Sequence, residues 1–175
     1  DVLKRMVGNK INSPATSSVG RLFDAFASLT GIRHTTSFEG QAAMQLEGAA
    51  CGAIDDHIYH FDIYEDTGGM LIIDWRRVLE QTISDIAGEI DAAIIALRFH
   101  KALAQSITGV AQRLGWRKLA LTGGCFQNVL PTECAVRMLE DAGITPIRHR
   151  RTPPNDGALA LGQVAWASKL REDSV

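Results

Sequence analysis

Apolar residues recur every three or four positions along most of the chain, and glycine or clustered polar residues interrupt this pattern at intervals. Such spacing places apolar side chains on one face of a helix, so it predicts a largely helical chain. The clearest helix follows Ser17 and Ser18, either of which is suited to cap it, and Gly31 ends it. The predicted helices cover residues 19–30, 39–47, 75–86, 89–114, 125–141 and 158–170.

Shorter apolar runs predict four strands. Residues 57–64 alternate between apolar and polar, and residues 70–73 return after a glycine-containing turn, which together indicate a hairpin. Residues 118–121 and 144–147 form two further strands on either side of a helix. A strand, a helix and a strand in this order indicate a mostly parallel sheet covered by helices, and hence one α/β domain over residues 1–175.

The composition is that of a globular protein with a sizeable core. The 175 residues are 46% hydrophobic and 22% charged. A net charge of −2 excludes a general polyanion-binding surface, so we expect no nucleic-acid partner and interpret the basic run 148–151 as a solvated loop. We expect no membrane association, because no apolar run approaches the roughly 20 residues that span a bilayer. Residues 1–10 are charged and lack the apolar segment of a signal peptide.

The three cysteines, Cys51, Cys125 and Cys134, include no CxxC pair, which disfavours a disulfide framework or a zinc knuckle. Free thiols fit a reducing compartment, so we expect a cytoplasmic location. Cys125 directly follows two glycines at the start of a predicted helix, an environment that lowers the pKa of a thiol and favours a nucleophile. The alternative is that Cys125 is a small, half-buried packing residue.

The Gly123-Gly124 pair ends the strand at residues 118–121, and a helical pattern follows it. A strand, a glycine turn and a helix together expose backbone N–H groups that bind an anion, usually a phosphate. Two glycines also admit a ligand closer to the backbone than a Cβ would allow, although a purely structural turn is the alternative. Ligands sit beyond the carboxyl ends of parallel strands. This turn and the loop at residues 152–157 are therefore predicted to lie on the same edge of the sheet.

Two other groups of polar residues are candidates for binding. In the Pro-Pro-Asn-Asp-Gly run at residues 153–157, the prolines restrict the chain and present Asp156 as a rigid carboxylate for a metal. The alternative is that Asp156 only caps the last helix. Asp24 or Glu39 is suited to ribose hydroxyls and Arg21 to an anion, although these charges alternatively belong to the solvated faces of amphipathic helices.

The five histidines include no HxxxH pair. His57 and His60 point to opposite faces of a predicted strand, which makes them poor joint ligands. His100 lies inside the long predicted helix and is interpreted as a packed or hydrogen-bonded residue. The sequence indicates no partner for His34 or His149.

Five motifs occur in an order that resembles one protein family. They are Ser18-Val-Gly-Arg-Leu-Phe-Asp-Ala25, Ser37-Phe-Glu-Gly-Gln-Ala-Ala-Met44, Arg98-Phe-His100, Thr122-Gly-Gly-Cys-Phe-Gln-Asn128, and Pro153-Pro-Asn-Asp-Gly157 with Leu161-Gly-Gln163. Over residues 13–167 the chain resembles the C-terminal part of the HypF carbamoyltransferases of nickel–iron hydrogenase maturation. Kae1/TsaD proteins of tRNA threonylcarbamoyl transfer and O-carbamoyltransferases of antibiotic synthesis are alternative, wider relatives. The sequence Gly-Gly-Cys-Phe-Gln-Asn at residues 123–128 favours HypF over these two groups.

The resemblance implies one lobe of an actin-like, RNase H-like ATPase (ASKHA) fold, with a mixed sheet covered by helices. It also implies that a carbamoyl-adenylate is made from carbamoyl phosphate and ATP in a YrdC-like domain. The Kae1-like domain then passes the carbamoyl group to the C-terminal cysteine of HypE, which leads to the cyanide ligands of the hydrogenase. The positions that match the family's adenylate, phosphate and ribose contacts are Glu39, Gly40, Gly123, Gly124 and Asn128.

The resemblance also matches Asp156 to the family's metal-binding aspartate, with iron or zinc completed by histidines outside this chain. Cys125 matches a variable position. The family's HxxxH pair and its acylphosphatase-like, zinc-finger and YrdC-like regions have no counterpart here, so we interpret the chain as the C-terminal lobe of a larger domain. We expect it to be inactive alone and to need the remaining HypF domains and HypE as partners. The competing hypotheses are a nucleotide-binding or assembly lobe without chemistry and, more weakly, a thiol enzyme using Cys125.

Overall fold

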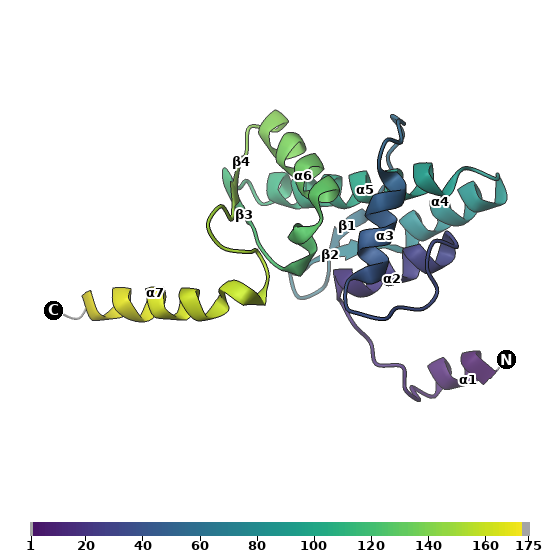
Figure 1. Ribbon diagram of the computed structural model, residues 1–175, viewed down its shortest axis with the longest axis horizontal. Coiled ribbons are helices and arrows are strands. Elements are labelled where there is room, and N and C mark those ends of the chain that lie inside the picture. Colours follow the sequence, from purple (N-terminus) through teal and green to yellow (C-terminus); the bar gives the residue numbers. More distant parts are fainter. Residues whose placement is uncertain (1, 173–175) are drawn as a thin grey trace.

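Helices make up most of the regular structure, and the long helix α5 runs through the middle of the molecule (Figure 1). The computed structural model describes residues 2–172. In chain order its helices, strands and short 3-10 turns (η) are α1 (Val2–Gly8), α2 (Val19–Leu29), α3 (Gln41–Ala50), β1 (Asp62–Glu65), β2 (Leu71–Asp74), α4 (Arg76–Ala87), α5 (Ala92–Arg113), β3 (Lys118–Leu121), η1 (Gly124–Gln127), α6 (Val129–Asp141), β4 (Thr145–Arg148), η2 (Asp156–Ala158) and α7 (Leu159–Glu172). The predicted α/β class is confirmed.

The strands of the described chain form two small sheets of two strands each. β1 and β2 pair antiparallel, which confirms the predicted hairpin. β3 and β4 pair in parallel, and α6 crosses between them as the strand–helix–strand pattern predicted. The expected mixed sheet is thus divided into two pairs. The hairpin packs instead on the end of α5, where Gly109 makes room for Ile63: a Cβ on Gly109 would lie 3.1 Å from the Ile63 side chain.

The larger core cluster lies where α2 and α3 meet the first part of α5. Phe23 and Phe26 from α2 and Phe99 from α5 are all at most 2% exposed. The Phe99 ring stacks on Phe26 with 4.1 Å between centroids and meets Phe23 edge-on at 5.3 Å. Such aromatic pairs contribute about 0.5–1.5 kcal/mol beyond the area that they bury. The helical spacing of the aromatic residues is therefore what joins these helices.

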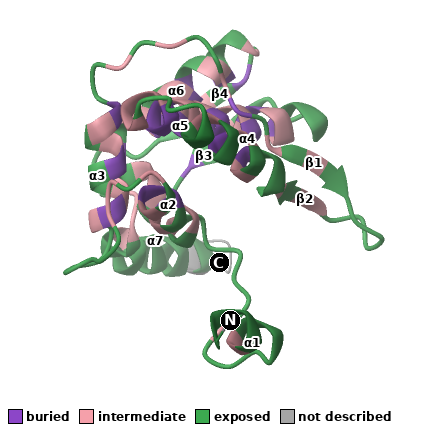
Figure 2. Cartoon of the chain, turned by 90° about the vertical axis from the view of Figure 1, so that its right-hand side faces the viewer, coloured by how far each residue is buried: buried purple, intermediate pink, exposed green. Residues whose placement is uncertain are grey.

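A second core cluster joins α6 and β3 to the last part of α5, with Leu121 and Leu139 at its centre. The boundary between the two clusters falls on α5, between Leu103 and Ala104. Figure 2 shows the buried residues gathered on α5 and on the faces of α2, α3 and α6 that are turned toward it. One helix therefore supplies apolar side chains to both clusters.

The predicted strand at residues 57–64 is wrong in its first part, because only Asp62–Glu65 pairs as β1. The preceding residues have no strand partner in the described chain. A side chain of α4 binds their backbone instead: the His60 N–H donates to Gln81 Oε1 at 2.9 Å. A distant side chain, and not a neighbouring strand, therefore accepts this backbone hydrogen bond. The alternation of apolar and polar residues within the segment cannot predict such a partner.

Arg98 of α5 anchors the same segment. It donates to Asp55 and to Asp85, with an N–O distance of 2.5 Å in both ion pairs. The fully buried Tyr59 hydroxyl also donates to Asp85 at 2.5 Å. Burial raises the pKa of Tyr59, and the hydrogen bond from Arg98 lowers the pKa of Asp55. The Arg-Phe-His motif therefore begins with a residue that fixes the fold.

Three helix boundaries show how local geometry decides where a helix starts. Ser18 caps α2 with its side chain, as predicted. α3 begins two residues later than predicted because Gly40 has a left-handed φ of 80°, which a helix excludes. α5 begins after Asp91, whose side chain caps it, and not at Glu89, which has a φ of +57°.

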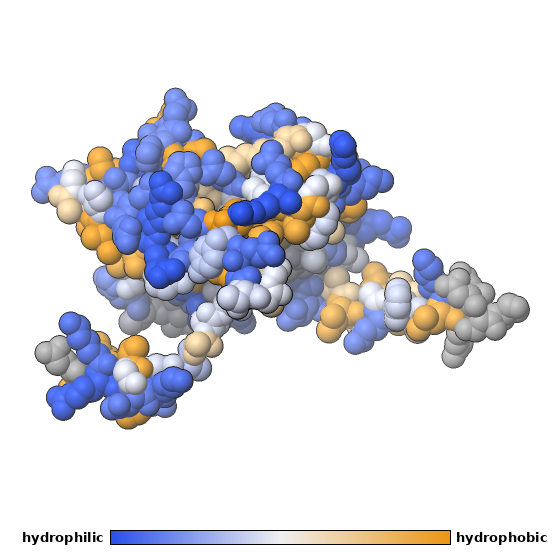
Figure 3. Space-filling model, turned by 180° about the vertical axis from the view of Figure 1, so that it is seen from behind, coloured by the Kyte–Doolittle hydropathy of each residue, from blue (hydrophilic) through white to orange (hydrophobic). Residues whose placement is uncertain are grey.

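The two terminal helices, α1 and α7, project from the body of the molecule (Figures 1 and 3). α7 was predicted at nearly its observed position, whereas α1 was not predicted. Large exposed apolar side chains on these helices are Val2, Leu3, Val7, Leu159, Leu161, Val164, Trp166 and Leu170. No helix within residues 2–172 is long and apolar enough to cross a membrane.

Candidate functional site

The Gly123-Gly124 turn follows β3 and leads into η1, not directly into a long helix as predicted. Gly123 has a φ of 110°, which L side chains rarely adopt, so glycine is required there. Gly124 has no such constraint, yet a Cβ on either glycine would meet no atom within 4 Å. The structure therefore leaves open space beside the backbone of both residues.

The turn is directly joined to the Pro-Pro-Asn-Asp-Gly loop. The Gly123 N–H donates to the Pro154 carbonyl at 2.7 Å, and the Thr122 hydroxyl reaches the same oxygen at 3.4 Å. His149, which follows β4, lies 3.0 Å from the Thr122 hydroxyl through Nε2. The prediction that both loops lie on one edge is confirmed, and the cause is the parallel pairing of β3 and β4.

Asp156 is the first residue of η2, and Asn155 is its N-cap. The Asn155 side chain accepts a hydrogen bond from the Gly157 N–H at 3.1 Å. The alternative in which Asp156 is the capping residue is therefore wrong. The Asp156 carboxylate is exposed and makes no hydrogen bond or ion pair with the described residues. It is free to bind a ligand from outside.

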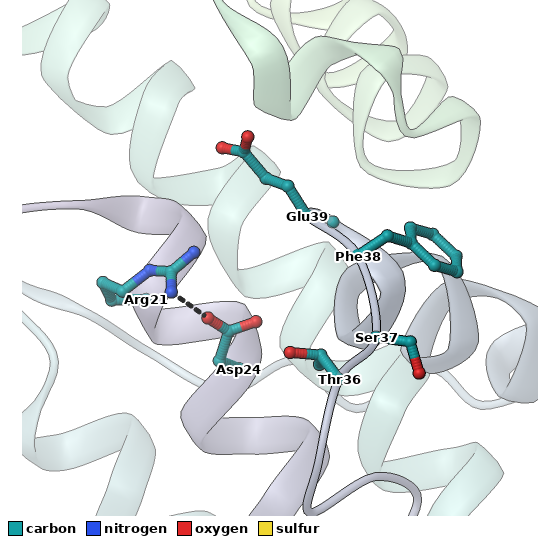
Figure 4. Close-up of a pocket in the computed structure, with 7 residues that line it drawn as sticks. Arg21, Asp24, Thr36, Ser37, Phe38 and Glu39 are labelled. Atoms are coloured by element: carbon teal, nitrogen blue, oxygen red, sulfur yellow. Dashed lines mark ion pairs between the residues drawn. The ribbon is translucent and has the colours of Figure 1, made fainter.

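Glu39 and Gly40 line an open cavity of about 420 Å³ together with Arg21 and Asp24 (Figure 4). Arg21 and Asp24 project from α2 and form an ion pair at 2.9 Å, while Glu39 comes from the loop before α3. The structure thus brings together the three charges that the sequence singled out. Both Arg21 and Glu39 are exposed, as the solvated-face alternative also requires.

Asn128 is the N-cap residue of α6 and is 8% exposed. Its carbonyl accepts a hydrogen bond from the Thr132 hydroxyl at 2.6 Å. The side-chain amide nitrogen of Asn128 is buried and has no hydrogen-bond partner in the described part of the chain. A buried donor without a partner is costly, so this amide is a group for which a ligand could supply the acceptor.

Cys125 packs against the larger core cluster and is half-buried. Burial raises the pKa of its thiol, which is opposite to the lowering expected at a helix start. Its packing and half-buried position favour the packing interpretation over a nucleophile. Cys51, Cys125 and Cys134 are all free thiols.

The histidines have separate environments. His100 is fully buried, its Nδ1 lies 2.7 Å from the Ala96 carbonyl, and burial lowers its pKa, in agreement with the predicted packed role. His34 lies 3.0 Å from the Ser28 hydroxyl. His149 lies between two threonine hydroxyls at 3.0 and 3.1 Å. Among residues 2–172 no three His, Cys, Asp or Glu side chains gather in a way that could hold a metal ion.

Sequence reasoning missed a second, smaller cavity of about 180 Å³ beside the Gly-Gly turn. Phe126 and Thr132 line it from η1 and α6, and Arg148, His149 and Arg150 line it from the end of β4. The sequence could have indicated this cavity, because the basic run begins at the end of the strand that pairs with β3. The run was interpreted only as a solvated loop, and its side chains are indeed exposed.

Comparison with protein families identifies the class. The model for "Carbamoyltransferase, Kae1-like Domain, second subdomain" matches residues 1–163. Carbamoyltransferase HypF of Synechocystis sp. is 36% identical over 96% of this chain and 22% of that protein. Carbamoyltransferase HypF2 of Cupriavidus necator is 34% identical over 97% of this chain and 24% of that protein.

Solved structures agree with this class. A full-length HypF in a phosphate- and nucleotide-bound form superposes with a TM-score of 0.86 at 31% identity, over 97% of this chain and 23% of that one. HypF of T. kodakarensis superposes with a TM-score of 0.83 at 26% identity, over 98% of this chain and 22% of that one. The fold is thus that of a Kae1-like carbamoyltransferase subdomain. The chain belongs to the HypF carbamoyltransferase family and spans under a quarter of the length of these relatives.

Proposed function

We propose that this chain forms one side of a carbamoyl-transfer site, where carbamoyl-adenylate gives its carbamoyl group to the C-terminal cysteine of HypE. The observation that carries the proposal is the hydrogen bond between Gly123 and Pro154, which joins an open glycine turn to the loop that bears the free Asp156 carboxylate. Membership in a carbamoyltransferase family supports the reaction. The nucleotide-bound state of a full-length HypF relative supports the substrate.

In this reaction the thiolate sulfur of HypE attacks the carbamoyl carbon, and a C–S bond forms as the C–O bond to the phosphate of AMP breaks. Negative charge then stays on the departing phosphate, so the site must stabilise it. Gly123 and Gly124 leave the backbone open to that phosphate, and the Asn128 amide offers an unused donor. Glu39 and Gly40, at the larger cavity, are assigned to the ribose.

Asp156 supplies one carboxylate ligand for a divalent metal, iron or zinc. A carboxylate oxygen suits either ion, but one exposed carboxylate binds weakly, so histidines from outside this chain supply the rest of the site. Such a metal, when bound, stabilises charge on phosphate oxygens.

The partners are the remaining HypF domains and HypE. The exposed apolar side chains of α1 and α7 are suited to contact those domains, because an apolar helix needs neighbours to exclude water. The three free thiols favour the cytoplasm as the place of action.

The Gly124→Val substitution tests the nucleotide site. Because a Cβ at Gly124 meets no protein atom, we expect the fold to persist, with a stability change of about 1 kcal/mol or less. In the protein that carries this chain together with the first Kae1-like subdomain, we expect carbamoylation of the HypE cysteine, followed by mass spectrometry, to be abolished. Gly48→Val is the matched control, since Gly48 on α3 also has no atom within 4 Å of a Cβ. Normal transfer by the Gly124 variant would show that the turn is only structural.

The Asp156→Ala substitution tests the metal site. We expect the 175-residue chain alone to retain no stoichiometric iron or zinc after dialysis and to transfer no carbamoyl group. The protein that includes the first subdomain should retain metal, and Asp156→Ala should weaken that retention. Nucleotide binding without transfer in the larger protein would favour a binding lobe without its own chemistry.

A further inference from the structure

The first turn of α6 is capped by a residue from another helix. The N–H groups at a helix start need acceptors, and the N-cap side chain usually supplies one to the second or third residue. The N-cap residue Asn128 makes no such bond with its side chain. Instead Glu47 of α3 accepts the N–H of Leu130, the second residue of α6, at 2.6 Å. The two residues are 83 positions apart in the chain.

The charge of Glu47 suits this place. A carboxylate at a helix start is stabilised by the helix dipole, and its hydrogen bond to an N–H is stronger than one between neutral groups. Glu47 is only partly exposed, so solvent screens the interaction incompletely. Burial lowers the pKa of His100 and Glu47 opposes that shift, so the carboxylate also acts on α5. Glu47 therefore lies where α3, α5 and α6 meet.

Capping by Glu47 changes what Asn128 is available for. Asparagine is among the best N-cap residues, and its side chain would ordinarily accept from its own helix. Because Glu47 accepts the Leu130 N–H, the Asn128 side-chain oxygen does not cap α6, and the side-chain amide keeps an orientation in which its buried nitrogen has no partner among the described residues. Without Glu47, rotation of Asn128 into the cap would be the simplest replacement.

α3 also connects this cap to the larger cavity. Gly40 precedes the helix and lines the cavity with Glu39, and Glu47 lies seven residues further on. Seven residues of helix rise about 10 Å. The start of α3 therefore lines the cavity, and a residue near the end of α3 binds the first turn of α6.

We propose that Glu47 is a positioning residue that caps α6 from α3, holds the 123–128 loop at a fixed distance from the Glu39 cavity, and keeps the Asn128 amide available for a ligand. The identity of that ligand as a nucleotide rests on the proposed function. Glu47 itself touches no substrate in this role.

Amide hydrogen exchange on the full 175-residue chain tests the positioning directly. In Glu47→Ala we expect exchange of the amides in residues 124–130 to accelerate about tenfold or more, as loss of a charge-assisted hydrogen bond implies. Glu47→Gln keeps an acceptor oxygen and should recover part of the protection. Glu133→Gln, which removes an exposed carboxylate of α6 paired with Arg148, is the control and should leave these amides unchanged. Unchanged exchange in Glu47→Ala, or equal acceleration throughout α5, would overturn the proposal.

Calorimetric titration with AMP separates this inference from the proposed function. In the protein with the first subdomain, we expect Glu47→Ala to weaken AMP binding about tenfold, Glu47→Gln to weaken it less and Glu133→Gln to leave it unchanged. If the wild type binds no AMP, the nucleotide proposal fails, and the exchange measurement still decides whether Glu47 positions the loop. Wild-type affinity in Glu47→Ala, with accelerated loop exchange, would disprove the role of Glu47 toward the ligand.

Discussion

α5 and α7 are both rich in apolar residues, yet their surroundings are opposite. Eleven of the 22 residues of α5 are buried, whereas every residue of α7 from Leu159 to Leu170 is exposed. Leu159 and Trp166 share one face of α7, while Leu161 and Val164 lie on the opposite face. A helix that is apolar on two faces needs neighbours on two sides. The contrast teaches that α5 finds packing partners within the described chain, whereas α7 leaves its apolar side chains exposed.

Phe99→Ala should give the largest effect, because Phe99 stacks on Phe26 at the centre of the larger cluster. We expect a loss of about 3–5 kcal/mol in the free energy of unfolding, through lost burial and the cavity that remains. Chemical denaturation followed by far-ultraviolet circular dichroism measures it. A loss below about 1 kcal/mol, the size of an average substitution, would mean that α5 is not the central packing element.

The pH dependence of stability tests the buried part of α5 further. Burial lowers the folded-state pKa of His100 below its unfolded value of about 6.5, so protons bind the unfolded chain first. The stability linked to neutral His100 is fully present above that value and falls as the pH decreases, by at most about 1.4 kcal/mol per pH unit. In His100→Leu this dependence between pH 7 and 5 should disappear. The exposed His34, changed to Gln, serves as the control and should keep it.

Trp166→Ser should have the smallest effect on the chain alone. Trp166 is 65% exposed, so we expect the free energy of unfolding to change by no more than about 0.5 kcal/mol. In the protein with the first subdomain the same substitution should destabilise the assembly measurably, in the same denaturation experiment. A large effect in the isolated chain would show that α7 already packs against this body and would remove the contrast with α5.

Features decided by neighbours in sequence could be predicted. Local capping and periodicity predicted the cap by Ser18, the hairpin and the β3–α6–β4 crossover. The parallel pairing of β3 and β4 then places the two loops on one edge of the sheet. α4 was predicted to begin at Trp75 and begins at Arg76. Asp74, its predicted cap, ends β2, and its side chain accepts the N–H of Arg76.

Features decided by distant residues could not be predicted. Gln81 and Arg98 hold the segment before β1. The spacing of apolar residues within that segment gives no indication of these partners. The same holds for the cap that Glu47 supplies to α6. Of the candidate site, the open glycine turn and the free Asp156 were foreseeable from residue type, whereas the burial that raises the pKa of Cys125 depends on how the core closes over it.

The continuity of α5 also determines how the chain unfolds. α5 passes from one core cluster to the other without a break between Leu103 and Ala104. Unwinding either half of the helix exposes apolar surface of that cluster and removes the support that keeps the other half helical. The body should therefore melt as one cooperative unit, with α1 and α7 fraying at much lower cost. No truncation inside α5 would then yield a piece that folds by itself, although the chain contains two separate clusters.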